Sequence, residues 1–173
     1  MTVTTLISPE MAAAVGREYQ WATSYPIAES DIRRWASAMY YPKTPPRLYW
    51  DAEYAKTTRW GGIVAPEEFN PFAWMRADPP GSMGPEAATP WPELDLGIPC
   101  PQFKANIFAG LEVEFTKVRM RPGDVIKSAL RLGGYHEKEG RLGLMLFTSR
   151  EDHWTNQNGE LVRISRGNLI RYL

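Results

Sequence analysis

The sequence predicts an α+β fold, with helices in the first half of the chain and antiparallel strands in the second. Three observations predict this class. Apolar residues recur with helical spacing between residues 29 and 39, the spacing changes to alternation from residue 107 onward, and Pro-Gly and Asn-Gly turns separate the later runs. Helices followed by a run of strands are typical of α+β domains, in which a helix lies on one face of a sheet.

Length and composition favour one domain over residues 1–173, because 43% of the residues are hydrophobic and can fill a core. Lysine plus arginine and aspartate plus glutamate each number 20, so the net charge is zero and we expect no binding to nucleic acid or to a membrane. The single cysteine, together with the absence of a signal sequence and of a long apolar run, favours a cytoplasmic location.

The first half of the chain contains three helix signals. Residues 29–39 place apolar side chains at helical spacing, namely Ile32, Trp35, Ala36 and Met39. Asp51 is suited to cap a short helix that the pair Gly61-Gly62 ends. Pro66, followed by two glutamates, favours a third helix of about ten residues over 66–76.

Residues 77–101 form a long segment without periodicity that is rich in proline and glycine. Irregular segments of this length are uncommon inside compact domains, and they usually cover a site or are mobile. We interpret it as a surface segment. The alternative is a lid held down by its apolar residues Trp91, Leu94, Leu96 and Ile98.

The second half predicts a meander of four long antiparallel strands. In the first strand Leu111, Val113 and Phe115 alternate with polar residues, so this face is expected to be buried. The remaining strands are expected at about 124–135, 141–154 and 161–173, separated by a turn at 136–140 and a hairpin at Asn158-Gly159.

Few residues in this chain have the spacing that catalysis requires. The two histidines, His136 and His153, and the lone Cys100 do not have ligand spacing, so we expect no metal and no cofactor. No phosphate-binding loop or nucleophile elbow is present either. One feature remains at residues 62–67, where backbone N–H groups at a helix start are able to polarise a carbonyl. Every helix start offers such groups, so this signal alone is weak.

The stretch LYWDAEYAKTTRWGGIVAPEEF, residues 48–69, resembles the MaoC-like acyl dehydratase superfamily. Within it, the chain is most similar to the group called the N-terminal half of MaoC dehydratase, or FAS1-like dehydratase domain, whose members read R-x-G-G-x-x-A-P-x-x-F. Three further stretches match in the same order: VGREYQWATSYPIAESDIRRWASA, AGLEVEFTKVRMRPGD and TNQNGELV. The resemblance implies a hotdog fold, in which a curved antiparallel sheet wraps a long central helix.

The resemblance also implies a ligand and a reaction. Members of the superfamily pair two hotdogs, and an acyl thioester of CoA or of acyl carrier protein enters a tunnel beside the helix start. The reaction is the reversible hydration of a trans-2-enoyl thioester, in which an aspartate and a histidine activate water and backbone N–H groups hold the thioester oxygen. The substrate-binding residues would then be Tyr49, Trp50, Trp60, Gly62, Ile63, Val64, Ala65 and Phe69.

The sequence departs from this superfamily at the catalytic motif D-x-N-P-x-H. Thr44 and Tyr49 occupy the positions of the aspartate and the histidine. Threonine does not ionise, and tyrosine, with a pKa of ~10, is a poor general base at neutral pH. We therefore interpret the chain as a subunit that shapes the acyl tunnel while a MaoC-like partner supplies the catalytic pair.

Two other interpretations stay open. The first is a self-sufficient homodimeric hydratase or thioesterase that uses a carboxylate, with Asp51 and Glu67 as candidates. The second is a hotdog without catalytic function that binds acyl-CoA. The sequence does not determine the acyl chain or choose between CoA and a carrier protein.

Overall fold

The computed structural model describes residues 5–73, 91–141 and 143–173, and its main element is a five-stranded antiparallel sheet. The strands lie in the order β1-β3-β4-β5-β2. Their bounds are β1 Glu18–Thr23, β2 Ala105–Phe115, β3 Lys127–Gly140, β4 Gly143–Thr155 and β5 Leu161–Tyr172. The helices are α1 Pro9–Ala13, α2 Glu29–Tyr40, the 3-10 helix η1 Arg47–Tyr49, α3 Ala52–Lys56 and α4 Pro92–Asp95.

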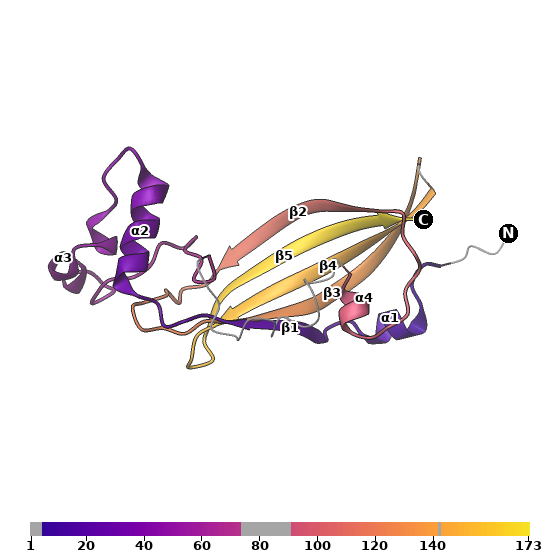
Figure 1. The fold of residues 1–173 in the computed structure, drawn as a ribbon, viewed down its shortest axis with the longest axis horizontal. Helices are drawn as coiled ribbons and strands as arrows, with labels where there is room; N and C mark the ends of the chain where they lie inside the picture. Colours follow the sequence, from indigo (N-terminus) through magenta and orange to yellow (C-terminus); the bar gives the residue numbers. More distant parts are fainter. Residues whose placement is uncertain (1–4, 74–90, 142) are drawn as a thin grey trace.

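The helices lie at the two ends of the sheet (Figure 1). At the end that holds the C-terminus, α1 and α4 lie close to the strands. Beyond the opposite end, α2, η1 and α3 form a separate lobe, which we call the helical lobe. Two of the sequence predictions for this lobe are confirmed. A helix forms at Glu29–Tyr40, and the Asp51 side chain caps α3 by accepting a hydrogen bond from the Tyr54 N–H.

The helix predicted over 66–76 does not form between Pro66 and Ala73. The chain makes turns there instead, with hydrogen bonds from Phe69 N to Pro66 O and from Ala73 N to Asn70 O. Pro71 has no N–H to donate to the preceding turn, which prevents a continuous helical ladder through this region. The Asn70 side chain accepts from Phe72 N and so favours a turn as well. Residues 74–76 of the predicted helix lie outside the described residues.

The predicted meander is confirmed for β3, β4 and β5, but β2 pairs with β5 and not with β3. The turn predicted at residues 136–140 is also wrong. These residues extend β3 and pair with β4, from His136 opposite Phe147 to Gly140 opposite Gly143. Gly143 has a φ of 93°, which glycine adopts without steric cost, so the reversal occurs after Gly140. The Asn158-Gly159 hairpin between β4 and β5 forms as predicted.

The burial predicted for the first strand is wrong. Leu111 is 62% exposed and Phe115 is 36% exposed, and Phe108 and Ile107 of the same strand are 55% and 48% exposed. The reason is that β2, one of the two edge strands, pairs with β5 only and has no described element packed over these side chains. Alternation indicates which side chains share a face of the strand, but it does not show whether anything covers that face.

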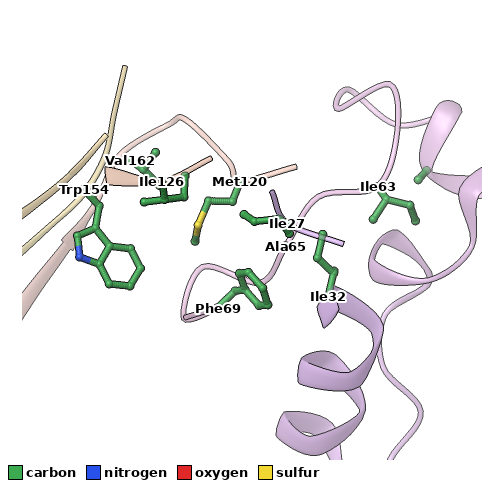
Figure 2. Close-up of a cluster of buried hydrophobic side chains, with 10 residues drawn as sticks. Ile27, Ile32, Ile63, Ala65, Phe69, Met120, Ile126, Trp154 and Val162 are labelled. Atoms are coloured by element: carbon green, nitrogen blue, oxygen red, sulfur yellow. The ribbon is translucent and has the colours of Figure 1, made fainter. Parts of the chain in front are cut away.

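Two apolar clusters form the core. The first joins the helical lobe to the sheet and contains the buried residues Ile27, Ile32, Ala55, Ile63, Ala65, Phe69, Met120, Ile126, Trp154 and Val162. Figure 2 shows Phe69 lying between the sheet residues and α2. The second cluster lies under α1 and α4, and includes Met11, Ile98, Phe103, Leu132 and Leu146.

The segment predicted to be irregular over 77–101 contains α4, and residues 77–90 lie outside the described residues. Of its four apolar residues, Trp91, Leu96 and Ile98 pack in the second cluster. Leu94 does not, and it is 55% exposed.

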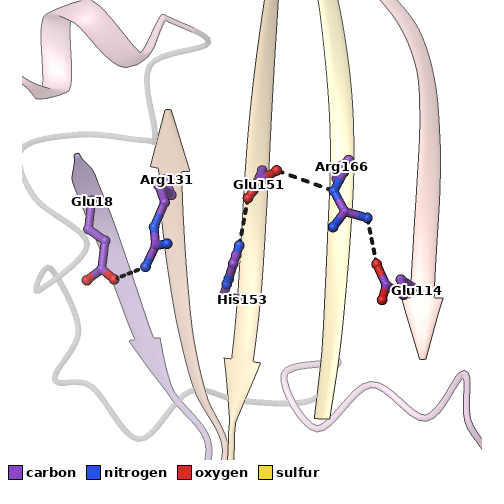
Figure 3. Close-up of polar contacts among 6 residues, drawn as sticks. All are labelled: Glu18, Glu114, Arg131, Glu151, His153 and Arg166. Carbon is purple, nitrogen blue, oxygen red and sulfur yellow. Dashed lines mark hydrogen bonds and ion pairs between the residues drawn. The ribbon is translucent and has the colours of Figure 1, made fainter. Parts of the chain in front are cut away.

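The opposite face of the sheet carries paired charges (Figure 3). Arg131 contacts Glu18 at 2.9 Å, and Arg166 contacts both Glu114, at 2.9 Å, and Glu151, at 3.3 Å. His153 lies 2.8 Å from Glu151 on this face. Because neighbouring residues of a strand point to opposite faces, His153 faces away from Trp154 and the first cluster.

Candidate active-site loop

The motif that carries the family resemblance forms a loop, residues 59–67, between the helical lobe and the sheet. We call it the glycine loop. Gly61 begins the turn with a φ of 66°, and its N–H donates to Thr58 O. Further along, the Ala65 N–H donates to Met120 O at 2.8 Å, which joins the loop to the connection between β2 and β3.

Three backbone N–H groups of the glycine loop, those of Gly62, Ile63 and Val64, donate no hydrogen bond to any residue in the described part of the chain. Val64 is 0% exposed, which leaves the N–H groups of Gly62 and Ile63 as the ones that a ligand can approach. A side chain at Gly62 would meet no atom within 4 Å, so its backbone is open to approach. The sequence predicts free N–H groups over residues 62–67, but the Ala65 N–H is already bonded to Met120 O. The helix start that was expected to supply these groups does not form either.

Arg119 holds the second half of the glycine loop. Its Nη2 donates to Ala65 O at 2.6 Å, and its Nη1 donates to Glu67 Oε1 at 3.1 Å. The same guanidinium lies 5.4 Å from the ring centre of Trp60, and that of Arg59 lies 4.6 Å from the same ring. Trp60 thus contacts two cationic groups, an arrangement that stabilises both charges.

Two tyrosines lie beside this loop. Tyr49 packs against the first cluster, which contains Ile63 and Ala65, and its ring centre is 6.1 Å from that of Tyr40. Burial raises the pKa of Tyr40, and the hydrogen bond with Tyr49 acts in the same direction. Tyr40 therefore stays protonated at neutral pH and can donate a hydrogen bond, but it cannot act as a base.

The two carboxylates considered as bases already have partners. Asp51 accepts from Tyr54 N at 3.0 Å and from Arg47 at 2.7 Å. The backbone hydrogen bond from Tyr54 and the one from Arg47 lower the pKa of Asp51, which identifies it as a helix cap. Glu67 is 47% exposed and paired with Arg119.

The expected substrate-binding residues divide into two groups. Tyr49, Trp60 and Gly62 are partly exposed along the glycine loop, whereas the side chains of Ile63, Val64, Ala65 and Phe69 are at most 6% exposed and belong to the interior. Trp50 is 38% exposed, and its indole N–H donates to Pro45 O. Thr44 is exposed.

A shallow hollow connects the glycine loop with the edge of the sheet. Pro66, Glu67 and Arg119 line it on one side, and Phe115 and Thr116 at the end of β2 line it on another. The hollow therefore opens next to the exposed apolar residues of the outermost strand. Arg119 belongs to one of the family-like stretches, but no sequence signal indicated its contact with the glycine loop, because the bond to Ala65 joins residues 54 apart.

A comparison with protein-family models matches residues 13–165 to the family described as FAS1-like, dehydratase domain region. The chain belongs to this FAS1-like dehydratase family. The match includes the glycine loop and all five strands up to Ser165, and it confirms the resemblance to MaoC-like dehydratases that the motifs indicated. No curated protein matches the chain.

Solved structures confirm the hotdog fold of this FAS1-like dehydratase chain. The ChsH1-ChsH2 complex from Mycobacterium tuberculosis matches with a TM-score of 0.60 and 18% identity, over 94% of this chain and 87% of the other. A MaoC-like dehydratase from Rhodospirillum rubrum matches with a TM-score of 0.56 and 18% identity, over 92% of each chain. R-hydratase PhaJ1 from Pseudomonas aeruginosa matches with a TM-score of 0.53 and 20% identity, over 91% of this chain and 81% of the other. At these identities the likeness concerns the fold.

None of the helices in residues 5–73, 91–141 and 143–173 has the length and apolar character needed to cross a membrane.

Proposed function

We propose that this chain is one subunit of an enoyl-thioester hydratase, which also catalyses the reverse dehydration of a 3-hydroxyacyl thioester. In this proposal the chain shapes the acyl tunnel, and a MaoC-like partner supplies the aspartate and the histidine. The observation that carries the proposal is the content of the motif positions, where Thr44 and Tyr49 replace the acid and the base.

The reaction explains why this replacement matters. Hydration adds the hydroxyl of water to Cβ of the enoyl group and a proton to Cα, so one group must remove a proton from water and one must deliver a proton to carbon. Near the glycine loop the ionisable candidates are two phenols, the Glu67 carboxylate paired with Arg119, and the exposed carboxylate of Glu68. His153 is directed to the other face of the sheet, where it contacts Glu151.

The chain can still contribute electrostatic stabilisation. The unbonded N–H groups of Gly62 and Ile63 are suited to donate hydrogen bonds to the thioester oxygen, on which negative charge develops when water attacks Cβ. Trp60 and Tyr49 would line the entrance for the acyl thioester. CoA is the carrier we propose, with acyl carrier protein as the alternative.

A second hotdog subunit fits the exposed edge of the sheet. The strand β2 has eleven residues and exposes Phe108, Leu111 and Phe115, the last of which also lines the hollow at the glycine loop. An uncovered edge strand with apolar side chains is suited to pair with a strand of another chain. The similarity in fold to the ChsH1-ChsH2 complex supports a partner of hotdog fold.

The test compares the chain alone with a mixture. Pure chain is assayed for hydration of crotonyl-CoA and of longer and sterol-derived enoyl-CoA thioesters by loss of the enoyl absorbance. The assay is then repeated with a MaoC-like protein from the same genome that carries the D-x-N-P-x-H motif, and with a variant of that partner in which the histidine is replaced by alanine. Activity only in the mixture, lost with the partner variant, supports the proposal.

The other outcomes identify the alternatives. Turnover by the pure chain that disappears in Glu67→Gln supports a self-sufficient enzyme that uses a carboxylate. Binding of acyl-CoA in calorimetry, without turnover in any mixture, supports a hotdog that only binds its ligand. Either result rules out the subunit proposed here.

A further inference from the structure

Arg119 contacts three residues of the glycine loop, which no sequence motif indicated. Its two terminal nitrogens bond to two different residues of the loop, Ala65 and Glu67, while its guanidinium lies against Trp60. The contacts thus fall on both sides of Gly62, whose N–H group is one of the unbonded three. The side chain is 12% exposed, so water competes little with these hydrogen bonds.

The backbone of Ala65 is held on both of its polar groups. Its carbonyl accepts from Arg119, and its N–H donates to the carbonyl of the next residue, Met120. These two bonds fix the peptide units on either side of Ala65, directly after the units that carry the unbonded N–H groups. A charged donor forms a stronger hydrogen bond than a neutral one, so the bond from Arg119 contributes most to this restraint.

We infer that Arg119 is a positioning residue, which holds the Gly62 and Ile63 N–H groups in the orientation that receives the thioester oxygen. This inference rests on the proposed function for its catalytic consequence, but the restraint itself is a property of the folded chain. Arg119 itself does not contact the reacting atoms. It acts through the loop, and a displacement of about 1 Å at a reacting centre lowers rates about a hundredfold.

The neighbouring Arg121 offers a matched control. It is the same residue type in the same connection, is exposed, and no contact of its side chain is seen with the described residues. The test variants are Arg119→Met, which removes every polar contact, and Arg119→Lys, which keeps the charge but cannot bond to Ala65 and Glu67 in the same planar geometry. Arg121→Met is the control.

The first measurement is hydrogen exchange of the Ala65 amide, whose N–H is bonded to Met120 O, within the peptide that contains residues 60–67. We expect exchange to rise at least about tenfold in Arg119→Met, to rise less in Arg119→Lys and to stay unchanged in Arg121→Met. Peptides from β4 should exchange alike in all variants, which shows that the fold is intact. Equal exchange of the loop in Arg119→Met and wild type overturns the inference.

The second measurement is kinetic and uses the active mixture with the MaoC-like partner. We expect kcat to fall about tenfold to a hundredfold in Arg119→Met with little change in KM, because the loop contributes more to the charged transition state than to substrate binding. Partial rescue by Arg119→Lys is also expected. A faster-exchanging loop with unchanged kcat overturns the positioning role. An inactive wild-type mixture instead rules out the proposed function. The hydrogen-exchange measurement then still tests whether Arg119 restrains the loop.

Discussion

Arg171 and Glu93 form an ion pair that is completely enclosed, with both side chains 0% exposed. Two nitrogens of Arg171 bond to the two carboxylate oxygens of Glu93, at 2.6 Å and 2.8 Å. Thr148 and Tyr135 complete the arrangement, the first accepting from Arg171 and the second donating to Glu93. Because Glu93 belongs to α4 and Arg171 to β5, the pair fixes residues 92–95 against the sheet.

Glu93→Gln should destabilise the fold strongly. The substitution keeps the size of the side chain but leaves the Arg171 guanidinium without a counter-charge in a site that excludes water. Breaking one side of a buried pair costs about 3–5 kcal/mol, and we expect a loss of this size in urea unfolding at pH 7. Glu53→Gln, which alters an exposed pair with Lys56, is the control and should not change the midpoint. Similar midpoints for both variants would show that the buried pair contributes little.

The same pair predicts a dependence of stability on pH. Burial alone would raise the pKa of Glu93, but the hydrogen bonds from Arg171 and Tyr135 and the charge of Arg171 outweigh burial and leave the pKa below its usual value of 4.5. The stabilisation is therefore fully present above the unfolded pKa and is lost as the pH falls through the lower folded pKa. The difference in unfolding free energy between wild type and Glu93→Gln should be constant from pH 6 to 7 and should shrink in acid. A difference that grows below about pH 4.5 contradicts this sign.

The sequence predicted the local elements well where a local signal exists. The stripe formed by Ile32 and Ala36 predicted α2, Asp51 predicted the cap of α3, and Asn158-Gly159 predicted the last hairpin. Each signal lies within a few residues of the element that it specifies, and tertiary contacts do not oppose it.

Long-range features were less accessible. Alternation in residues 111–115 identified a strand but not its place at the edge, which depends on pairing with β5. The motif predicted the glycine loop and its family, whereas Arg119 lies more than fifty residues away and its contact with Ala65 exists only in the fold.

The helix expected from Pro66 failed for a local reason, because Pro71 and Asn70 favour turns.

Leu111→Asp should weaken association with the partner without unfolding the chain. Leu111 is 62% exposed on the outer strand, so a carboxylate there costs the isolated chain little, whereas in a subunit interface it would lose its hydration. We expect the dissociation constant measured by sedimentation with the MaoC-like partner to rise at least about tenfold.

Trp21→Ala supplies the control for that experiment. Trp21 is 53% exposed, but it lies on β1 at the other edge of the sheet. Its loss should leave association unchanged. If Trp21→Ala weakens the complex and Leu111→Asp does not, the partner binds the β1 edge and the interface proposed here is wrong.

Gly62→Val should block the thioester while the fold stays intact. A Cβ at Gly62 meets no atom within 4 Å, so the larger side chain fits the free chain, but it would project into the space beside the unbonded N–H groups. We expect the affinity for an acyl-CoA to fall at least about tenfold in the complex with the partner, as measured by calorimetry, with an unchanged melting temperature. Gly62→Ala should give a smaller loss. Gly61→Val differs in kind, because Gly61 has a φ of 66° and a branched residue there strains the backbone and should lower the melting temperature. Unchanged acyl-CoA affinity in a folded Gly62→Val complex would show that the thioester does not bind at the glycine loop.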